Sequence, residues 1–393
     1  TGTSIDLDRL RGHTDQVVDG LTGGIAGLLK RRGVTTLRGR ARFSSRTSLE
    51  LEGGEVSGVD FEQAIIATGS SLANLPEGIS DRVWSSADAL TLPRIPESLL
   101  VVGGYIGLEL GLLYLGLGSK VSVCEFSPRL LMGADHDLVD VMVKSVSDRL
   151  EEVLLESKAQ SITPLDDGGF EVVVEHEGES RTLTFDQVLV AIGRRPNTHD
   201  LGLEHTAVQV DDRGVIRTDG ECRTDEPNLF AIGDITSGPM LAHKASREAK
   251  VAAEVICGQK AAFDNRAIPA VVYTDPEIAW TGLTEREAQA EGIAVKVGKF
   301  PLTALGRART LDRTDGLVKV ICHPEDELIL GMGIVGPHAS ELIAEGTLAI
   351  EMGATVEDLV ATIHPHPTLS EAVLEAAEAV QGAAVHVNPP RKR

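Results

Sequence analysis

The sequence predicts an α/β protein, and three features carry this prediction. Residues 98–125 read as a buried strand, a glycine-rich turn, a helix and a second strand ending at Glu125. Two later segments, 184–197 and 226–238, each place an apolar strand directly before a glycine-containing turn, as ligand sites at sheet edges do in α/β folds. From about Ala267 strand-like and helical runs alternate, which is typical of an α+β domain.

The remaining elements follow from hydrophobic spacing. Residues 7–31 carry apolar positions at helical spacing and Gly33 follows as a stop signal, so one amphipathic helix is expected there. Pro93 and Pro96 then mark a boundary. Strands are expected at 34–43, 48–54, 63–71, 270–274, 316–321 and 328–336, and helices at 340–353, 356–363 and 368–380.

Length and composition bound the class of protein. A chain of 393 residues is expected to form two or three domains. Its apolar runs are short and its first residues lack the pattern of a signal peptide, so we expect a soluble, cytoplasmic protein that does not enter a membrane. The formal net charge of -22 repels phosphate and argues against nucleic acid or an anionic membrane as a partner. Such a charge suits a salt-adapted host, although an ordinary acidic bacterial enzyme also carries it.

The cysteines show no functional pattern. Cys124, Cys222, Cys257 and Cys322 are far apart, with neither the spacing of a metal site nor a redox pair among them. We therefore expect reduced, structural thiols and no metal site.

The turn from Val102 to Gly107, VGGYIG, has the character of a dinucleotide-binding turn. A pyrophosphate needs backbone amides at a helix N-terminus and no side chains in the way. Glu125, about twenty residues further on, can bind a ribose 2′-hydroxyl and would repel the 2′-phosphate of NADP, which favours NAD. The turn departs from G-x-G-x-x-G because Val102 stands at the first glycine. A glycine-rich turn without any nucleotide is the alternative.

Residues 361–372, ATIHPHPTLSEA, gather ionisable side chains near the end of the chain. Histidine titrates in the physiological range, and Glu371 could hold the imidazole of His366 in one tautomer, which would make a general base. Thr368 followed by Glu371 is also a capping-box pattern that opens a helix, with His366 as a loop residue. The sequence pattern leaves both interpretations open.

Six motifs occur in a characteristic order: GGYIGLELG, AIGRRPN, LFAIGDI, PMLAHKA, DPEIAWTGLTE and HPHPTLSEA. In this order and spacing the chain resembles the dihydrolipoamide dehydrogenases, among the flavin-dependent pyridine nucleotide–disulfide oxidoreductases. The resemblance implies a flavoprotein disulfide reductase fold with two dinucleotide-binding domains and a C-terminal α+β dimerisation domain. The expected parts are an incomplete FAD-binding domain at 1–95, an NAD-binding domain at 96–215, a return segment of the FAD-binding domain at 216–265 and the dimerisation domain at 266–393.

The resemblance also implies site residues. Asp234 of the AIGD motif is expected to bind the ribityl chain of FAD, and Glu109 to lie near the nicotinamide. The other expected FAD contacts are Gly39, Ala41, Thr68, Gly69, Met240, Leu241, Ala242 and His243. The other expected NAD contacts are Gly103, Gly104, Tyr105, Ile106, Gly107, Glu125, Ala159, Ala191, Ile192, Gly193 and Arg194. Each of these alone could be structural, but their joint occurrence favours the two cofactors.

The resemblance assigns a role to the two C-terminal side chains. In the family this histidine and glutamate reach into the partner subunit's site, so His366 would take a proton from the dithiol substrate and Glu371 would orient its ring. His364 would be supportive. The implied reaction is oxidation of protein-bound dihydrolipoamide by NAD through a disulfide and FAD. The implied partners are a second copy in a homodimer and the lipoyl domain of a 2-oxoacid dehydrogenase or glycine cleavage complex.

The chain departs from the family at its beginning. The first G-x-G-x-x-G and the Cys-x4-Cys disulfide of the family are not among its residues. We expect Thr1 to align downstream of both, with roughly eighty to ninety residues of a usual subunit missing. The alternatives are a short protein that binds NAD and dimerises without catalysis, or another FAD-dependent disulfide reductase.

Overall fold

The computed structural model describes residues 5–166 and 168–387. Contacts divide the chain into two compact units, one formed by residues 1–74 and 193–264 and the other by residues 75–192 and 265–393. The division of the chain at residues 95, 215 and 265 into FAD-binding, NAD-binding and dimerisation domains stays a prediction. Among the described residues, no helix is long and apolar enough to cross a bilayer.

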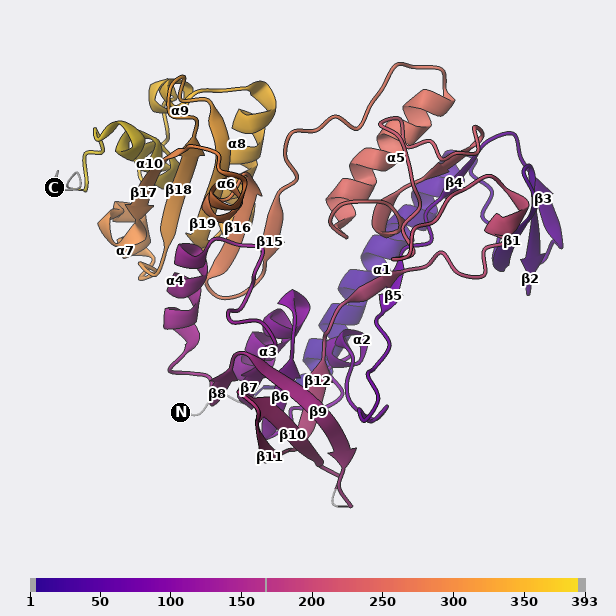
Figure 1. Cartoon of the computed structure of the whole chain (residues 1–393), viewed down its shortest axis with the longest axis horizontal. Coiled ribbons are helices and arrows are strands. Elements are labelled where there is room, and N and C mark those ends of the chain that lie inside the picture. Colours follow the sequence, from indigo (N-terminus) through magenta and orange to yellow (C-terminus); the bar gives the residue numbers. More distant parts are fainter. Residues whose placement is uncertain (1–4, 167, 388–393) are drawn as a thin grey trace. The chain divides into compact units, whose positions relative to one another are not determined.

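The first unit combines helices with short strands in three small sheets (Figure 1). Strands β1, β2 and β3 are antiparallel, β4 pairs in parallel with β14, and β5 pairs antiparallel with β13. The elements of this unit are α1 (Leu7–Arg31), β1 (Arg40–Ser45), β2 (Ser48–Glu52), β3 (Gly58–Asp60), β4 (Ala64–Ile66), β5 (Ser70–Leu72), β13 (Arg194–Pro196), η1 (Leu203–His205), β14 (Leu229–Ala231), η2 (Gly233–Ile235) and α5 (Ala242–Ile256).

Helix α1 has the bounds that its apolar spacing predicts. Asp6 caps it by accepting a hydrogen bond from the amide of Arg9 at 3.0 Å. None of its residues is buried, and its large apolar side chains are exposed: Val17, Val18, Leu21, Ile25 and Leu28. The spacing therefore predicts the helix but not the exposure of its apolar face.

The first predicted strand is wrong in its extent. Residues 34–39 are not a strand, and β1 begins at Arg40. Its partner β2 ends at Glu52, opposite Arg40, and the chain turns away at Gly53 with φ +75°. A strand needs a neighbour for its backbone groups, so the apolar run before Arg40 does not extend β1.

The second unit contains the βαβ segment that the sequence predicts. Strands β6 and β7 are parallel and joined by α3, and they lie inside a four-stranded parallel sheet in the order β12-β6-β7-β8. Strand β7 ends at Cys124, one residue earlier than predicted. The elements of this part are α2 (Ser86–Leu90), β6 (Ser98–Val102), α3 (Tyr105–Leu117), β7 (Lys120–Cys124), α4 (His136–Val146), β8 (Glu152–Leu154), β9 (Ser157–Pro164), β10 (Phe170–His176), β11 (Glu179–Phe185) and β12 (Gln187–Val190).

The C-terminal part of the second unit is built on a five-stranded antiparallel sheet in the order β15-β16-β19-β18-β17, with α8, α9 and α10 beside it (Figure 1). Its last helix is predicted from Thr368 but begins at Glu371. The elements are β15 (Ala270–Val272), β16 (Glu277–Gly282), α6 (Glu285–Glu291), β17 (Lys296–Pro301), η3 (Leu302–Ala304), α7 (Gly306–Thr310), β18 (Leu317–Cys322), β19 (Ile329–Gly336), α8 (Ala339–Met352), α9 (Val356–Ala361) and α10 (Glu371–Gln381).

Both faces of this sheet are covered. A Cβ on Gly346 of α8 would lie 2.6 Å from the sulfur of Met332, and a Cβ on Gly333 would lie 2.5 Å from Leu138 of α4. Since neighbouring residues of a strand point to opposite faces, α8 packs on one face of β19 and α4 on the other. Lys319 pairs with Gly333 in the sheet, so its side chain points to the α4 face.

Candidate functional site

The predicted dinucleotide turn connects β6 to α3. Val102 is the last residue of β6 and is paired on both sides, with Val190 and with Cys124. The backbone reverses at Gly103 and Gly104, whose φ angles are +75° and +73°. The strand therefore continues through the position where the fingerprint has its first glycine, and the turn is made by the next two residues.

Two glycines of this turn allow a close approach of the backbone to the loop after β12. A Cβ on Gly104 would lie 2.3 Å from the carbonyl oxygen of Ala191, and one on Gly107 would lie 2.9 Å from Val101 and 3.1 Å from Ala191. No side chain caps the N-terminus of α3, so its first amides are open to an anion. The turn therefore offers backbone amides to an anion, and its assignment to the pyrophosphate of NAD stays a prediction.

Glu125 lies at the edge of the same turn. The amide of Gly103 donates to the carbonyl of Cys124 at 2.9 Å, which places the following residue, Glu125, beside the glycines. The Glu125 carboxylate accepts a hydrogen bond from the amide of Ser127 at 2.8 Å, which fixes its direction. Ala159 lies on the neighbouring strand β9.

Two predicted NAD residues on α3 contact the C-terminal part of the same unit. Glu109 accepts a hydrogen bond from the amide of Tyr273 at 2.8 Å. Burial raises the pKa of Glu109, and this hydrogen bond opposes the shift only in part. The ring of Tyr105 stacks on Trp280 with centroids 6.4 Å apart, and its hydroxyl accepts from the amide of Gly133 at 2.8 Å.

The predicted FAD residue Asp234 lies in η2 of the first unit. Its carboxylate accepts a hydrogen bond from the Ser70 hydroxyl at 2.5 Å, and Arg194 donates to Ser70 at 2.7 Å. Arg194, predicted as an NAD contact, is thus part of a chain of hydrogen bonds that ends at Asp234. Ala191 and Ile192 belong to the other unit.

Further predicted FAD residues lie near this chain of hydrogen bonds. The Thr68 hydroxyl donates to the backbone carbonyl of Asn197 at 2.7 Å, and the backbone amide of Asn197 donates to the carbonyl of Gly69 at 2.9 Å. These bonds tie the loop before β5 to the end of β13. Gly39 and Ala41 belong to a separate part of the unit, at the start of β1.

Helix α5 begins at Ala242, directly after Met240 and Leu241, and no side chain caps its N-terminus. Its core face contains a lysine and a glutamate, Lys244 and Glu248, which are both buried. The sequence analysis missed both. The signal was their spacing, since they continue the buried stripe formed by Val251, Ala252 and Val255.

The C-terminal histidine and glutamate are in direct contact. The Nδ1 of His366 donates to Oε1 of Glu371 at 2.8 Å, while Oε2 of Glu371 accepts from the amide of Thr368 at 2.8 Å. The Thr368 hydroxyl donates to the carbonyl of Pro365, and the N-cap of α10 is Ser370, so the capping box predicted from Thr368 and Glu371 does not form. Burial raises the pKa of Glu371, but the hydrogen bonds from Thr368 and His366 outweigh this effect and lower the pKa.

The neighbouring His364 is placed differently. Its side chain is 4% exposed and bridges the carboxylate of Glu345, 2.8 Å from Nε2, and the carbonyl of Thr362, 2.9 Å from Nδ1. It therefore ties the histidine loop to α8, whereas the His366 side chain is 78% exposed.

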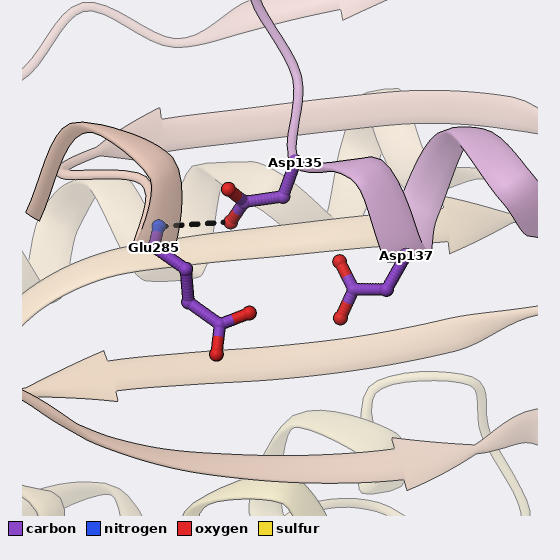
Figure 2. Close-up of side chains that lie close together, drawn as sticks. All are labelled: Asp135, Asp137 and Glu285. Atoms are coloured by element: carbon purple, nitrogen blue, oxygen red, sulfur yellow. Dashed lines mark hydrogen bonds between the residues drawn. The ribbon is translucent and has the colours of Figure 1, made fainter. Parts of the chain in front are cut away.

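Three carboxylates converge between α4 and α6, and no metal site was expected from the sequence. Figure 2 shows Asp135, Asp137 and Glu285 close together, with Asp135 accepting a hydrogen bond from the amide of Glu285 at 3.0 Å. The ammonium group of Lys319, which is fully buried, contacts all three carboxylates, and it lies 2.9 Å from Asp135 and from Asp137. Lys299 adds a second positive charge. The ammonium groups of Lys319 and Lys299 already pair with these three carboxylates, so we assign no metal to them.

The four cysteines are unpaired in the structure. Burial raises the pKa of Cys124, Cys222 and Cys322 to about 11. Such thiols stay protonated at neutral pH and are poor nucleophiles.

Comparisons with known proteins cover nearly the whole chain. The family model for pyridine nucleotide-disulphide oxidoreductases matches residues 3–249, and the model for the dimerisation domain of these proteins matches residues 268–377. A dihydrolipoyl dehydrogenase of Geobacillus stearothermophilus is 45% identical over 387 residues, which are 98% of this chain and 82% of the relative. The enzyme of the same name from Thermus scotoductus is 47% identical over 390 residues, which are 98% and 83% of the two chains.

Two solved structures are also similar to this chain over most of its length. LpdA from Mycobacterium tuberculosis superposes with a TM-score of 0.88 at 27% identity, covering 96% of this chain and 84% of that one. RclA, an HOCl-induced flavoprotein disulfide reductase of Escherichia coli, has a TM-score of 0.84 at 26% identity, covering 94% and 85%.

Proposed function

Because this chain belongs to the pyridine nucleotide-disulphide oxidoreductase family, we propose that it functions as a dihydrolipoyl dehydrogenase. The fold class follows from the same likeness: an α/β flavoprotein disulfide reductase fold with a C-terminal dimerisation domain. The proposed reaction is oxidation of protein-bound dihydrolipoamide with NAD. Its support is the name shared by the curated relatives and the arrangement of His366 and Glu371.

The His366 imidazole is the observation that carries this proposal. Its Nδ1 donates to a carboxylate, so the neutral ring carries its proton on Nδ1 and leaves Nε2 as a base. The ring is largely exposed. Exposure is required of a base that takes a proton from a substrate bound outside this domain. Glu371 orients the ring and stabilises the positive charge that appears when Nε2 takes the proton.

The residues present fit both cofactors of the family. At the NAD turn, the uncapped first amides of α3 are available to a pyrophosphate and Glu125 supports a ribose hydroxyl. In the first unit, Asp234 offers a carboxylate to the ribityl chain, and the uncapped start of α5 offers backbone amides to the flavin ring. When bound, FAD would accept the electrons that the dithiol substrate gives to the redox-active disulfide of the family, and would pass them on to NAD.

The disulfide of the family is not among the residues of this chain, whose four cysteines are far apart. We therefore assign to this chain the base, the NAD site and part of the FAD site. The dimerisation domain supports a homodimer, in which His366 would serve the site of the partner subunit. We propose the lipoyl domain of a 2-oxoacid dehydrogenase or glycine cleavage complex as the substrate protein, and the cytoplasm as its location.

The test is an assay of the complete gene product, purified and titrated with FAD. We expect dihydrolipoamide to drive reduction of NAD, with NADP at least about 10-fold less effective because Glu125 repels its 2′-phosphate. A protein that binds NAD and forms dimers but does not oxidise dihydrolipoamide would refute the proposal and favour a binding module. Preference for a different disulfide substrate would favour another reductase of the family.

A further inference from the structure

A buried ion pair on α5 holds the turn that carries Asp234. Lys244 and Glu248 are one helical turn apart, and their charged groups lie 3.0 Å from each other. Both side chains are almost completely buried, at 2% and 7% exposure. Burying two charges costs much free energy unless additional hydrogen bonds satisfy them, so the partners of this pair show what it supports.

All of those partners belong to η2 and the residue after it. The Glu248 carboxylate accepts from the amide of Gly233 at 2.6 Å and from the hydroxyl of Thr236 at 3.1 Å. The Lys244 ammonium donates to the carbonyl of Gly233 at 3.0 Å and to the Thr236 hydroxyl at 2.8 Å. Both backbone groups of Gly233 are therefore held by the ion pair, and Asp234 is the next residue.

The turn at Gly233 has a backbone conformation that suits glycine. Its φ is +78°, in the left-handed region, and a Cβ there would lie 3.3 Å from Ala245 of α5. The turn is a single short 3-10 segment whose own hydrogen bonds fix few of its dihedral angles. On its other side, the Asp234 carboxylate is held through Ser70 and Arg194. The carboxylate thus lies between two sets of contacts, and the ion pair holds the backbone of the preceding residue, while the amide of Ile216 donates to the carbonyl of the following residue, Ile235, at 2.8 Å.

We propose that Lys244 and Glu248 are positioning residues for FAD binding, because their buried ion pair fixes the η2 turn and thereby aims the Asp234 carboxylate at the ribityl chain. This inference rests on the proposed function, which assigns FAD to Asp234. Both side chains are buried beneath the turn. Their effect passes through the backbone of Gly233.

The test measures the affinity for FAD of the complete gene product and of three variants. Glu248→Gln and Lys244→Met each leave one buried group without its counter-charge, and we expect FAD to bind about 10-fold more weakly or worse, the scale of coupling within one hydrogen-bond network. The double variant Lys244→Met with Glu248→Gln is neutral and keeps an oxygen for the Gly233 amide, so its affinity should recover in part. The matched control is Lys250→Met with Glu254→Gln, the same residue types at the same spacing away from the buried face of α5, which should leave the affinity unchanged.

A second measurement separates positioning from mere stability. In an Asp234→Ala background, Glu248→Gln should weaken FAD binding by less than about 2-fold, because the carboxylate that it aims is gone. If Glu248→Gln weakens FAD binding equally with and without Asp234, or if it lowers the melting temperature of the apoprotein while FAD affinity equals that of the control, the inference is wrong. If the unaltered protein itself binds no FAD, the proposed function fails, and that result is read from the wild-type titration alone.

Discussion

Replacing Gly104 with alanine tests whether the turn after β6 is shaped for a dinucleotide. Gly104 has φ 73° and ψ 162°, a region that is essentially restricted to glycine and costs other residues about 1–3 kcal/mol. The new methyl group would also lie 2.3 Å from the Ala191 carbonyl oxygen, so the backbone of one segment must move. Overpacking of this kind costs about 1–3 kcal/mol. Together the two effects predict a loss of about 2–6 kcal/mol in the free energy of unfolding.

The same displacement should reach the NAD site. Any shift that relieves the contact moves the amides at the start of α3 away from the pyrophosphate, so we expect NADH affinity to fall about 10-fold or more. Urea unfolding and a fluorescence titration with NADH measure the two effects. The matched control is Gly116→Ala in the same helix, where the new Cβ meets no atom within 4 Å. The control should gain up to about 1 kcal/mol and bind NADH normally.

A Gly104→Ala protein as stable as Gly116→Ala, with the same NADH affinity, would refute the reasoning. It would show that the turn relaxes without cost and that its shape is not selected for a ligand.

Three further predictions concern buried polar groups of the second unit. Lys319→Met removes the ammonium group from between Asp135, Asp137 and Glu285 and should lower the free energy of unfolding, measured in urea, by about 3–5 kcal/mol. Lys299→Met, at a half-exposed site, should lower it by about 1 kcal/mol or less. Equal losses in the two variants would contradict this prediction. Burial raises the pKa of Glu109, so its carboxyl group keeps its proton to higher pH in the folded protein than in the unfolded chain. In urea titrations, the wild type should therefore lose stability relative to Glu109→Gln as pH rises above 4.5. A stability difference that does not change with pH would contradict this prediction. Tyr114→Phe removes the hydrogen bond that the buried hydroxyl donates to the Ala89 carbonyl at 2.8 Å, although the Leu92 amide still donates to that carbonyl, and it should cost about 1 kcal/mol in thermal unfolding. No loss would show that the hydroxyl adds no stability.

Local pattern was enough to predict the elements that frame the site. The family and the fold class predicted from six motifs are confirmed, and α1 and the segment β6-α3-β7 lie where hydrophobic spacing places them. These elements depend on contacts close in sequence, which spacing and glycine signals report. The strand expected at 34–43 failed because an apolar run does not reveal whether a partner strand continues beside it.

The supporting residues could not be predicted because their partners are distant in the sequence. Lys319 lies in an apolar strand, and the carboxylates that neutralise it are 184, 182 and 34 positions away. In the sequence, Arg194 has the position of a residue in an NAD turn. Its hydrogen bond to Ser70 depends on the pairing of β13 with β5, which the sequence does not reveal. Of the two interpretations of Glu371, the contact with His366 fits the orienting one, whereas its bond to the Thr368 amide holds the loop before the helix, whose N-cap is Ser370.

The most direct test of the proposed function is His366→Ala in the complete gene product, assayed with two electron acceptors. We predict that dihydrolipoamide-driven reduction of NAD falls by about 10²-fold or more, the usual scale for loss of a general base, while electron transfer from NADH to a dye is retained. Glu371→Gln should be milder because the side-chain amide of the variant can still accept from the ring but offers no counter-charge. His323→Ala, another exposed histidine bonded to a carboxylate, is the control and should be active in both assays. Undiminished dihydrolipoamide oxidation by His366→Ala would contradict the account, and so would an equal loss of both activities.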